Sequence, residues 1–429
     1  MPLVYVGLAL AFCWIVVDWN NVSTLFSDML LFDNYALAFS GLLVITTLLW
    51  FLISPTFFHE TTSRIDHFVL IIFALIGGVV MVSFSNLLML FLGLEILSIS
   101  MYVLAGSRKS SLRSNEAALK YFLMGAFATG FLLFGIAMVY GATASFDIAY
   151  ISRAVGETGG DTLLLKTGVI MIMAAMAFKV SAAPFHFWAP DVYEGSPTVI
   201  TAFMSTVVKT AAFAAFLRLF MGAFGDIQSA WSSTLWIISA LTILIGNITA
   251  VWQHNVKRML AYSSIAHAGY MLLAILAMNT SSASSLLYYT IAYSVSSITS
   301  FAILLIVSRS TGNESIESFH GMAKRNPMLA TVTIVAMFSL AGIPPLAGFF
   351  AKYYIFTSAI QSGLTGLVLI AVLGSLIGVY YYFRVVIAMF REAEAGNVEI
   401  SGGQQAVLIL TTAIAFLLGI LPGMVEGLL

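Results

Sequence analysis

Long apolar segments, separated by short polar ones, follow one another along the whole chain. Most of them are roughly 17–25 residues long, the length that a helix needs to cross the hydrocarbon of a bilayer. This pattern predicts an all-α polytopic membrane protein with about 13 transmembrane helices. The predicted spans are 2–17, 37–54, 67–84, 86–106, 116–141, 163–187, 198–222, 232–252, 258–279, 284–308, 328–362, 365–390 and 405–427.

Prolines interrupt two of these apolar segments, and each interrupted segment carries a lysine. In FKVSAAPFHFWAPDVYEGSPTVITAFMSTVVKTAAF, Pro184 follows Lys179, and a polar turn leads to a second apolar run with Lys209. In AGIPPLAGFFAK, the dipeptide Pro344–Pro345 precedes Lys352. Broken helices at membrane depth are tolerated only where they face protein or water. We therefore expect both breaks to lie inside the protein, beside a path for ions or water.

The order of the spans predicts an internal repeat. The runs 67–222 and 232–390 each contain five predicted spans with the break in the fourth. An odd number of spans places the two units in opposite orientations, which is the inverted-repeat pattern of transporters. Across this repeat, Glu95 corresponds to His267 and Lys179 corresponds to Lys352. The predicted divisions are N-terminal helices at 1–66, the first repeat at 67–222, the second repeat at 232–390 and a C-terminal helix at 391–429.

The basic residues between the predicted spans are distributed unevenly. One alternating set of loops holds Arg64, Arg108, Lys109, Arg113, Lys257, Arg258, Arg309, Lys324, Arg325 and Arg391. The other set holds only Arg153 and Lys166. Cytoplasmic loops carry the excess of Lys and Arg, so the first set is predicted to be cytoplasmic. The N-terminus is then expected inside and the C-terminus outside.

The composition supports this class and excludes others. The chain has 429 residues, of which 60% are hydrophobic and 9% charged, with a mean hydropathy of +1.00. The net charge of −1 excludes a basic nucleic-acid surface. Cys13 is the single cysteine, so no disulfide framework or cysteine-ligated cluster is expected, and no nucleotide-binding glycine motif is present. The first segment has no basic n-region and no small-residue cleavage site, so it is interpreted as a mature helix.

A few ionisable residues are predicted deep in the membrane. Burying an ammonium in hydrocarbon costs at least a few kcal/mol, which makes Lys179, Lys209 and Lys352 candidates for an ion path. Glu95 is the acid predicted at mid-span, and its expected partner is Lys179. A static buried pair that sets helix register is the alternative, although such pairs are weak stabilisers. His267 could relay a proton, or it could be a core histidine that is only hydrogen-bonded.

Other titratable residues leave their roles more open. Arg218 and Arg384 lie toward helix ends, where extension of the side chain to the interface is the simpler interpretation. Lys120 lies one turn inside a cytoplasmic end, so the same extension and a function are equally plausible. His186, beside a proline, is balanced between function and simple hydrogen bonding. His254 lies at a cytoplasmic end and is expected to be solvated.

Several motifs, in order, resemble one family over nearly the whole chain. They are LGLEILSISMYVLAG, SNEAALKYFLMGAFATGFLLFGIAMVYG, the proline-broken segment quoted above, NVKRMLAYSSIAHAGYMLLA, LAGIPPLAGFFAKYYIF and SLIGVYYYFRVV. This set resembles the subunit-N family of proton-pumping NADH:quinone oxidoreductases (complex I). The resemblance implies an antiporter-like fold of fourteen helices with two inverted five-helix units. The resemblance also implies that this sequence lacks the first helix of that fold, which would account for the expected N-terminus inside.

The resemblance also implies roles for individual residues. Glu95 and Lys179 match the family's ion pair, Lys209 matches its central lysine, and Lys352 matches the lysine of the second broken helix. His267 lies in the family's S-S-I-x-H motif. Two further lysines, Lys120 and Lys257, also fall on family lysine positions.

The function implied is coupled proton translocation without a redox centre in this chain. A proton from the cytoplasm would load Lys209, while making and breaking of the Glu95–Lys179 pair changes the field there. The proton would then pass by way of His267 toward Lys352 and the outer side. FMN, iron–sulfur clusters and quinone are expected in partner subunits, which supply the energy.

The expected partners are membrane lipid, K-type and M-type membrane subunits and, through them, a hydrophilic arm, in a bacterial inner (plasma) membrane. One alternative is a subunit of a multisubunit cation/proton antiporter, which shares the fold. The N-E-A-A-L-K-Y-F and W-A-P-D-V-Y-E-G motifs favour subunit N. Another alternative is a membrane scaffold whose lysines are inert.

Overall fold

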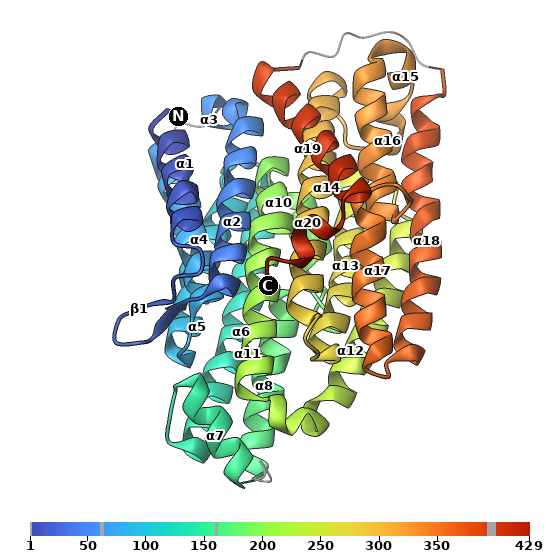
Figure 1. Cartoon of the computed structure of the whole chain (residues 1–429). Helices are drawn as coiled ribbons and strands as arrows, with labels where there is room; N and C mark the ends of the chain where they lie inside the picture. Colours follow the sequence, from blue (N-terminus) through green and yellow to red (C-terminus); the bar gives the residue numbers. More distant parts are fainter. Residues whose placement is uncertain (1, 61–63, 159–161, 393–399) are drawn as a thin grey trace.

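The computed structural model describes residues 2–60, 64–158, 162–392 and 400–429, and nearly all of this is helical (Figure 1). The helices are α1 (Pro2–Val17), α2 (Asn34–Ile53), α3 (Pro55–Glu60), α4 (Arg64–Ser83), α5 (Leu87–Ala105), α6 (Leu112–Thr143), α7 (Ile148–Thr158), α8 (Leu163–Lys179), α9 (Trp188–Gly195), α10 (Thr198–Phe203), α11 (Lys209–Ala223), α12 (Gln228–Val251), α13 (Val256–Ala277), α14 (Ser282–Thr311), α15 (Met322–Arg325), α16 (Pro327–Ala341), α17 (Ala347–Gln361), α18 (Thr365–Met389), α19 (Gly402–Ile420) and α20 (Gly423–Glu426). A π-helical turn η1 (Met204–Val208) joins α10 to α11, and η2 (Gly225–Ile227) and η3 (Ile316–Phe319) are short 3₁₀ turns.

The long helices stand side by side, with the first half of the chain on one side of the molecule and the second half on the other (Figure 1). Within the described residues, ten helices are long and apolar enough to cross a membrane, and α1 and α16 are shorter apolar helices. The predicted all-α membrane fold is therefore confirmed. Each predicted span overlaps at least one helix of the bundle; span 163–187 overlaps α8, which is not among these twelve, and the count of 13 spans stays a prediction.

Side-chain caps explain where several of these helices begin. Asn86 accepts a hydrogen bond from the Leu88 amide at the start of α5, and Asn255 accepts one from the Arg258 amide at the start of α13. Such caps satisfy amide groups that the first turn of a helix leaves without an intrahelical partner. These polar residues lie in the short segments between apolar runs, so the local sequence sets the boundaries.

The first broken segment differs from the predicted span 163–187. Helix α8 ends at Lys179, before the proline, and the chain turns through Ser181, whose φ is 62°. The peptide bond Ala183–Pro184 is cis, and a separate short helix, α9, begins at Trp188. The helix ends early because the residues before Pro184 leave the helical conformation, which a following proline disfavours.

Two features of the fold are absent from the sequence-based prediction. A two-stranded antiparallel hairpin, β1 (Ser23–Leu25) and β2 (Leu30–Phe32), connects α1 to α2. Helix α7 lies outside the bundle at the same end of the molecule (Figure 1). Both elements are short and strongly polar at their ends, so a hydropathy window suited to long spans does not detect them.

The two predicted repeat units share a packing pattern. Helix α4 packs against α5 and α11, just as α12 packs against α13 and α18. The first two helices of each unit meet at glycines, where a Cβ would clash with the facing helix: Gly77 and Gly93 in one pair, Gly246 and Gly269 in the other. Small residues of this kind let membrane helices approach closely. This pattern is what a repeat requires; the inverted repeat and the four-part division of the chain stay predictions.

Candidate functional site

The lysine at the first break is buried and hydrogen-bonded. Lys179 is the last residue of α8, and its Nζ donates to Ser98 Oγ of α5 at 2.5 Å. Ser98 lies one turn after Glu95 on the same helix. The break therefore places an ammonium group against a polar position of α5, in the middle of the bundle.

Glu95 and Lys179 lie near each other but form no ion pair, although the structure describes both residues. Instead, Thr129 Oγ1 of α6 donates to Glu95 Oε1 at 2.7 Å. A cavity of about 10 Å³ lies between the helices, lined among others by Ser98, Tyr102, Thr129 and Lys179. That is roughly the space of one water molecule. The expected direct pair is thus corrected to an arrangement in which hydroxyl groups separate the carboxylate from the ammonium.

Lys209 lies at the centre of the bundle, directly after the π-helical turn η1. Its Nζ donates to the Ser264 carbonyl of α13 at 2.6 Å and also to the Ser264 hydroxyl. Tyr293 of α14 donates to the same hydroxyl at 2.9 Å, and its ring centroid lies 6.0 Å from the ammonium. Single π-helical turns occur often at functional sites, because they turn a side chain out of the regular helical register.

His267 is held between two tyrosines. Its Nδ1 lies 2.6 Å from the Tyr289 hydroxyl, and its Nε2 lies 3.2 Å from the Tyr382 hydroxyl. The His267 ring also lies against the Tyr293 ring, with centroids 4.9 Å apart. A neutral imidazole offers one donor and one acceptor, and each hydroxyl can act as either. The His267 imidazole can therefore accept a proton at one ring nitrogen and release one from the other.

The lysine of the second break lies on the far side of its prolines. Lys352 is in α17, after the cis peptide Pro344–Pro345, whereas Lys179 precedes its break. Lys352 Nζ donates to the Ala341 carbonyl at 2.7 Å and to Ser375 Oγ at 2.8 Å. Both lysines thus lie beside a break, one before it and one after it, and their correspondence across a repeat stays a prediction.

A chain of polar groups leads from the histidine toward Lys352. Tyr382 is next to Tyr381, which donates to Asn247 Oδ1 at 3.2 Å. Asn247 Nδ2 in turn donates to the Tyr270 hydroxyl at 2.9 Å, and the Lys352 ammonium lies 5.3 Å from the Tyr270 ring centroid. These residues were not predicted from the sequence. The signal for them was the presence of tyrosines in the middle of apolar spans, as in LLYYTIAYS and VYYYF.

Lys120 is part of an ion-pair cluster near the predicted cytoplasmic end. Its Nζ lies 2.7 Å from Glu116 and 2.9 Å from Asp191 of α9. Arg258 bridges Asp191 at 3.0 Å and Glu194 at 2.7 Å. Burial raises the pKa of the Asp191 carboxyl, but hydrogen bonds from Lys120 and Arg258 lower it, so that this pKa lies below its ordinary value. Lys120 and Arg258 thereby fasten α9 to α6 and α13.

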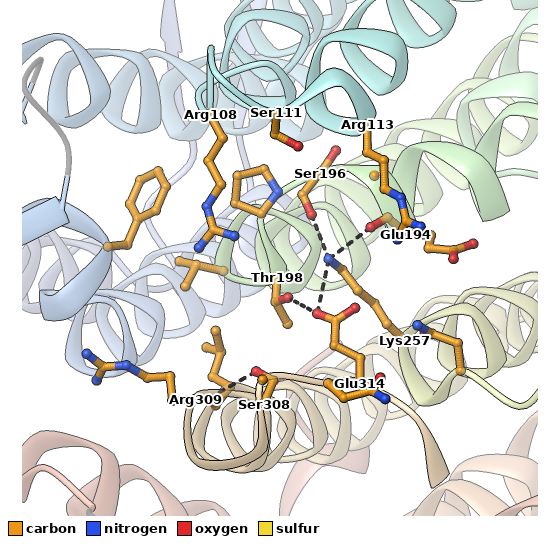
Figure 2. A pocket seen from close by; sticks show the side chains of 18 residues that line it. Arg108, Ser111, Arg113, Glu194, Ser196, Thr198, Lys257, Ser308, Arg309 and Glu314 are labelled. Carbon is orange, nitrogen blue, oxygen red and sulfur yellow. Dashed lines mark hydrogen bonds and ion pairs between the residues drawn. The ribbon is translucent and has the colours of Figure 1, made fainter. Parts of the chain in front are cut away.

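Lys257, which precedes Arg258 on α13, is buried and holds the linker between α9 and α10 (Figure 2). Its Nζ donates to the Ser196 carbonyl at 2.6 Å and to the Glu194 carbonyl at 3.2 Å, and lies 3.5 Å from the Glu314 carboxylate. Thr198 donates to the same carboxylate at 2.6 Å. The structure therefore places Lys120 and Lys257 at one end of the bundle, apart from Lys209 and Lys352.

Arg218 and Arg384 both donate hydrogen bonds at the ends of helices, while their expected extension toward the interface stays a prediction. Arg218 donates two hydrogen bonds to the Asp33 carboxylate. It also donates to the carbonyl of Val82, in the last turn of α4, and to that of Phe84, just after the helix ends. Arg384 donates to the Val251 carbonyl at the end of α12. Each arginine therefore caps the C-terminal end of the first helix of its unit, where a cation is favoured by the helix dipole.

Comparisons with known proteins show the family of this chain. Residues 84–378 match the family model described as NADH:quinone oxidoreductase/Mrp antiporter, TM. The NADH-quinone oxidoreductase subunit N of Cytophaga hutchinsonii is 47% identical over 407 residues, covering 94% of this chain and 88% of that protein. A chain of respiratory complex I from Thermus thermophilus superposes with a TM-score of 0.85 at 34% identity, covering 99% of this chain and 92% of that one. A chain of the Mrp complex from Dietzia sp. reaches a TM-score of 0.89 at 18% identity, covering 100% and 90%, and shares the fold.

Proposed function

This chain belongs to the NADH:quinone oxidoreductase/Mrp antiporter family, and on that premise we propose that it is the proton-translocating subunit N of a respiratory NADH:quinone oxidoreductase. The observation that carries this proposal is that Lys179, Lys209, His267 and Lys352 are all buried inside the helix bundle. Intramembrane ionisable groups are costly and are retained on ion paths. Subunit N relatives at 38–47% identity support this assignment over the antiporter, since the Mrp chain is only 18% identical.

Lys209 is the central proton carrier in this proposal. Its ammonium is stabilised by the carbonyl and hydroxyl of Ser264, which can hold the charged form in an otherwise apolar surrounding. A proton released from Lys209 reaches the Tyr293 and Ser264 hydroxyls, and the His267 ring lies next to Tyr293. Tyr382, Tyr381 and the groups beyond them then continue the path.

Glu95 and Lys179 act as the control element. The hydroxyl groups of Ser98 and Thr129 and a site for one water connect the carboxylate to the ammonium. A shift of α5 against α8 would bring the two charges together or separate them. Either change alters the electrostatic field along the bundle, because charges interact strongly where little water screens them.

The energy must come from outside this chain. Moving one proton against 100 mV requires about 2.3 kcal/mol. We infer that the chain is a non-redox subunit, and that flavin, iron–sulfur clusters and quinone reside in partner subunits. K-type and M-type membrane subunits are the proposed neighbours, and the bacterial inner membrane is the proposed location.

Replacement of Lys209 by Met tests the proposal. Met keeps the length and apolar stem but cannot carry a proton, so proton pumping in inverted vesicles should fall at least about tenfold. The control variant is Lys324→Met, at a side chain that is 81% exposed, and it should pump normally. Unchanged pumping by an assembled Lys209→Met complex would instead support an inert scaffold. Copurification of flavin and iron–sulfur proteins separates subunit N from the antiporter, which brings neither.

A further inference from the structure

A pocket of about 380 Å³ opens at the predicted cytoplasmic end of the bundle (Figure 2). We call it the basic pocket and define it by Arg108, Arg113, Ser196, Lys257, Arg309 and Glu314, which lie on segments from both halves of the chain. The proton path proposed above does not use this pocket. Its chemistry therefore requires a separate explanation.

The charge lining the basic pocket is positive. Of the described residues that line it, Arg108, Arg113, Lys257 and Arg309 are cations, and Glu194 and Glu314 are the carboxylates. Both acids are already engaged, Glu314 with Lys257 and Thr198 and Glu194 with Arg258. A pocket with this balance attracts anions and repels a hydronium ion, so it is poorly suited as a proton inlet.

Three helix N-termini add to the positive potential. Ser111, Pro197 and Asn255, which precede α6, α10 and α13, all line the pocket. Pro197 provides no side-chain cap for the continuous helix Thr198–Ala223, which is 26 residues long. Amide groups in that first turn therefore have no intrahelical partner, and the helix dipole favours an anion there.

An unsatisfied hydroxyl points to a missing ligand. Ser196 is 1% exposed, it lines the pocket, and its Oγ has no hydrogen-bond partner among the described residues. A buried polar group without a partner costs about 1–3 kcal/mol. An anion in the pocket would accept its hydrogen bond, and the cations around it would neutralise the charge.

We propose that the basic pocket binds the phosphate group of an anionic ligand. Arginine suits phosphate because its planar guanidinium offers paired donors. A phospholipid headgroup and free inorganic phosphate share this chemistry. Basic pockets between membrane helices on the cytoplasmic side bind such headgroups, and Phe57 and Leu305 add apolar lining beside the charges. A bound phosphate would tie the α5–α6 loop to the end of α14, and so connect the two halves of the chain.

The test uses the full chain in its purified membrane assembly, reconstituted in nanodiscs of defined lipid. The double variant Arg108→Gln/Arg309→Gln should bind phosphatidylglycerol roughly 20- to 30-fold more weakly, as expected for two cations near the membrane surface. Binding is followed by the number of phosphatidylglycerol molecules retained after washing, counted by mass spectrometry. The control Lys324→Gln/Arg391→Gln removes two exposed charges near the same end and should leave retention unchanged.

Two further measurements keep the proposal falsifiable. Ser196→Ala retains every charge but removes one donor, so it should weaken binding about tenfold. Titration of inorganic phosphate in lipid-free detergent separates the two sources: a rise in melting temperature that the double variant lacks identifies free phosphate as a ligand. The proposal fails if the pocket and control variants retain equal lipid and inorganic phosphate has no effect. In unsubstituted protein, equal stabilisation by phosphatidylglycerol and phosphatidylcholine, with no response to phosphate, also overturns it.

Discussion

Substitution of Arg218 by Gln should destabilise the protein by about 2–3 kcal/mol. Arg218 donates to the two Asp33 carboxylate oxygens at 3.0 and 3.2 Å, to the Phe84 carbonyl at 2.9 Å and to the Val82 carbonyl at 3.2 Å. Breaking a fully buried ion pair costs about 3–5 kcal/mol, while an exposed pair contributes about 0–1 kcal/mol. The two side chains are 12% and 33% exposed, which places this pair between those limits.

A double-mutant cycle with Asp33→Asn isolates the pair. Asn keeps an oxygen that can accept the Ala36 amide hydrogen bond at the start of α2, so the helix cap survives while the charge is lost. We expect a coupling energy of about 1–2 kcal/mol. Unfolding in mixed micelles of detergent and sodium dodecyl sulfate, followed by tryptophan fluorescence, measures each variant.

Arg153→Gln provides the matched control. This arginine is exposed; within the described part of the chain its one hydrogen bond is to the Ala149 carbonyl of its own helix, at 3.3 Å, and it also lies over the Tyr150 ring. Its loss should change stability by no more than about 0.5 kcal/mol. If Arg218→Gln were as mild as this control and the coupling energy were zero, the reasoning would be wrong. Arg218 would then extend to the interface, as the sequence alone suggested.

Three other perturbations test separate parts of the structure. Gly125→Ala should destabilise by about 1–3 kcal/mol, because the new Cβ would lie 1.9 Å from the Tyr102 hydroxyl; an unchanged melting temperature would contradict this packing. The Asp191 carboxyl has a pKa below its ordinary value, so its contribution to stability is present above about pH 4 and is lost as pH falls through the lowered pKa. The melting temperature of Asp191→Asn should therefore fall less steeply between pH 6 and pH 3 than that of the unsubstituted protein. Tyr382→Phe removes the hydroxyl that bonds to His267 Nε2 and should lower proton pumping about tenfold or more with the assembly intact, whereas normal pumping would remove the tyrosine from the path.

Much of the architecture was accessible without the structure. The lengths of the apolar segments and the uneven distribution of Lys and Arg between loops both follow from the free-energy cost of placing polar groups in lipid. Each segment bears that cost by itself, so it can be recognised from local sequence. For this reason the all-helical membrane fold, both broken segments and the unusual positions of Lys209 and Lys352 could be deduced from residue order. A buried ammonium stands out in a sequence because few other side chains are so expensive to bury.

The partners of these lysines depended on tertiary structure. Tyrosine and serine are neutral and tolerated in any span. The tyrosines of LLYYTIAYS and VYYYF stand out in apolar segments, but the sequence did not show that Tyr289 and Tyr382 contact His267 or that Ser264 contacts Lys209. Only helix packing brings Ser264 to Lys209 and places two tyrosine hydroxyls on His267. Packing likewise leaves hydroxyl groups between the Glu95 carboxylate of α5 and the Lys179 ammonium of α8. Which side chains meet depends on where two helices cross, and the hydropathy of the sequence does not specify that position.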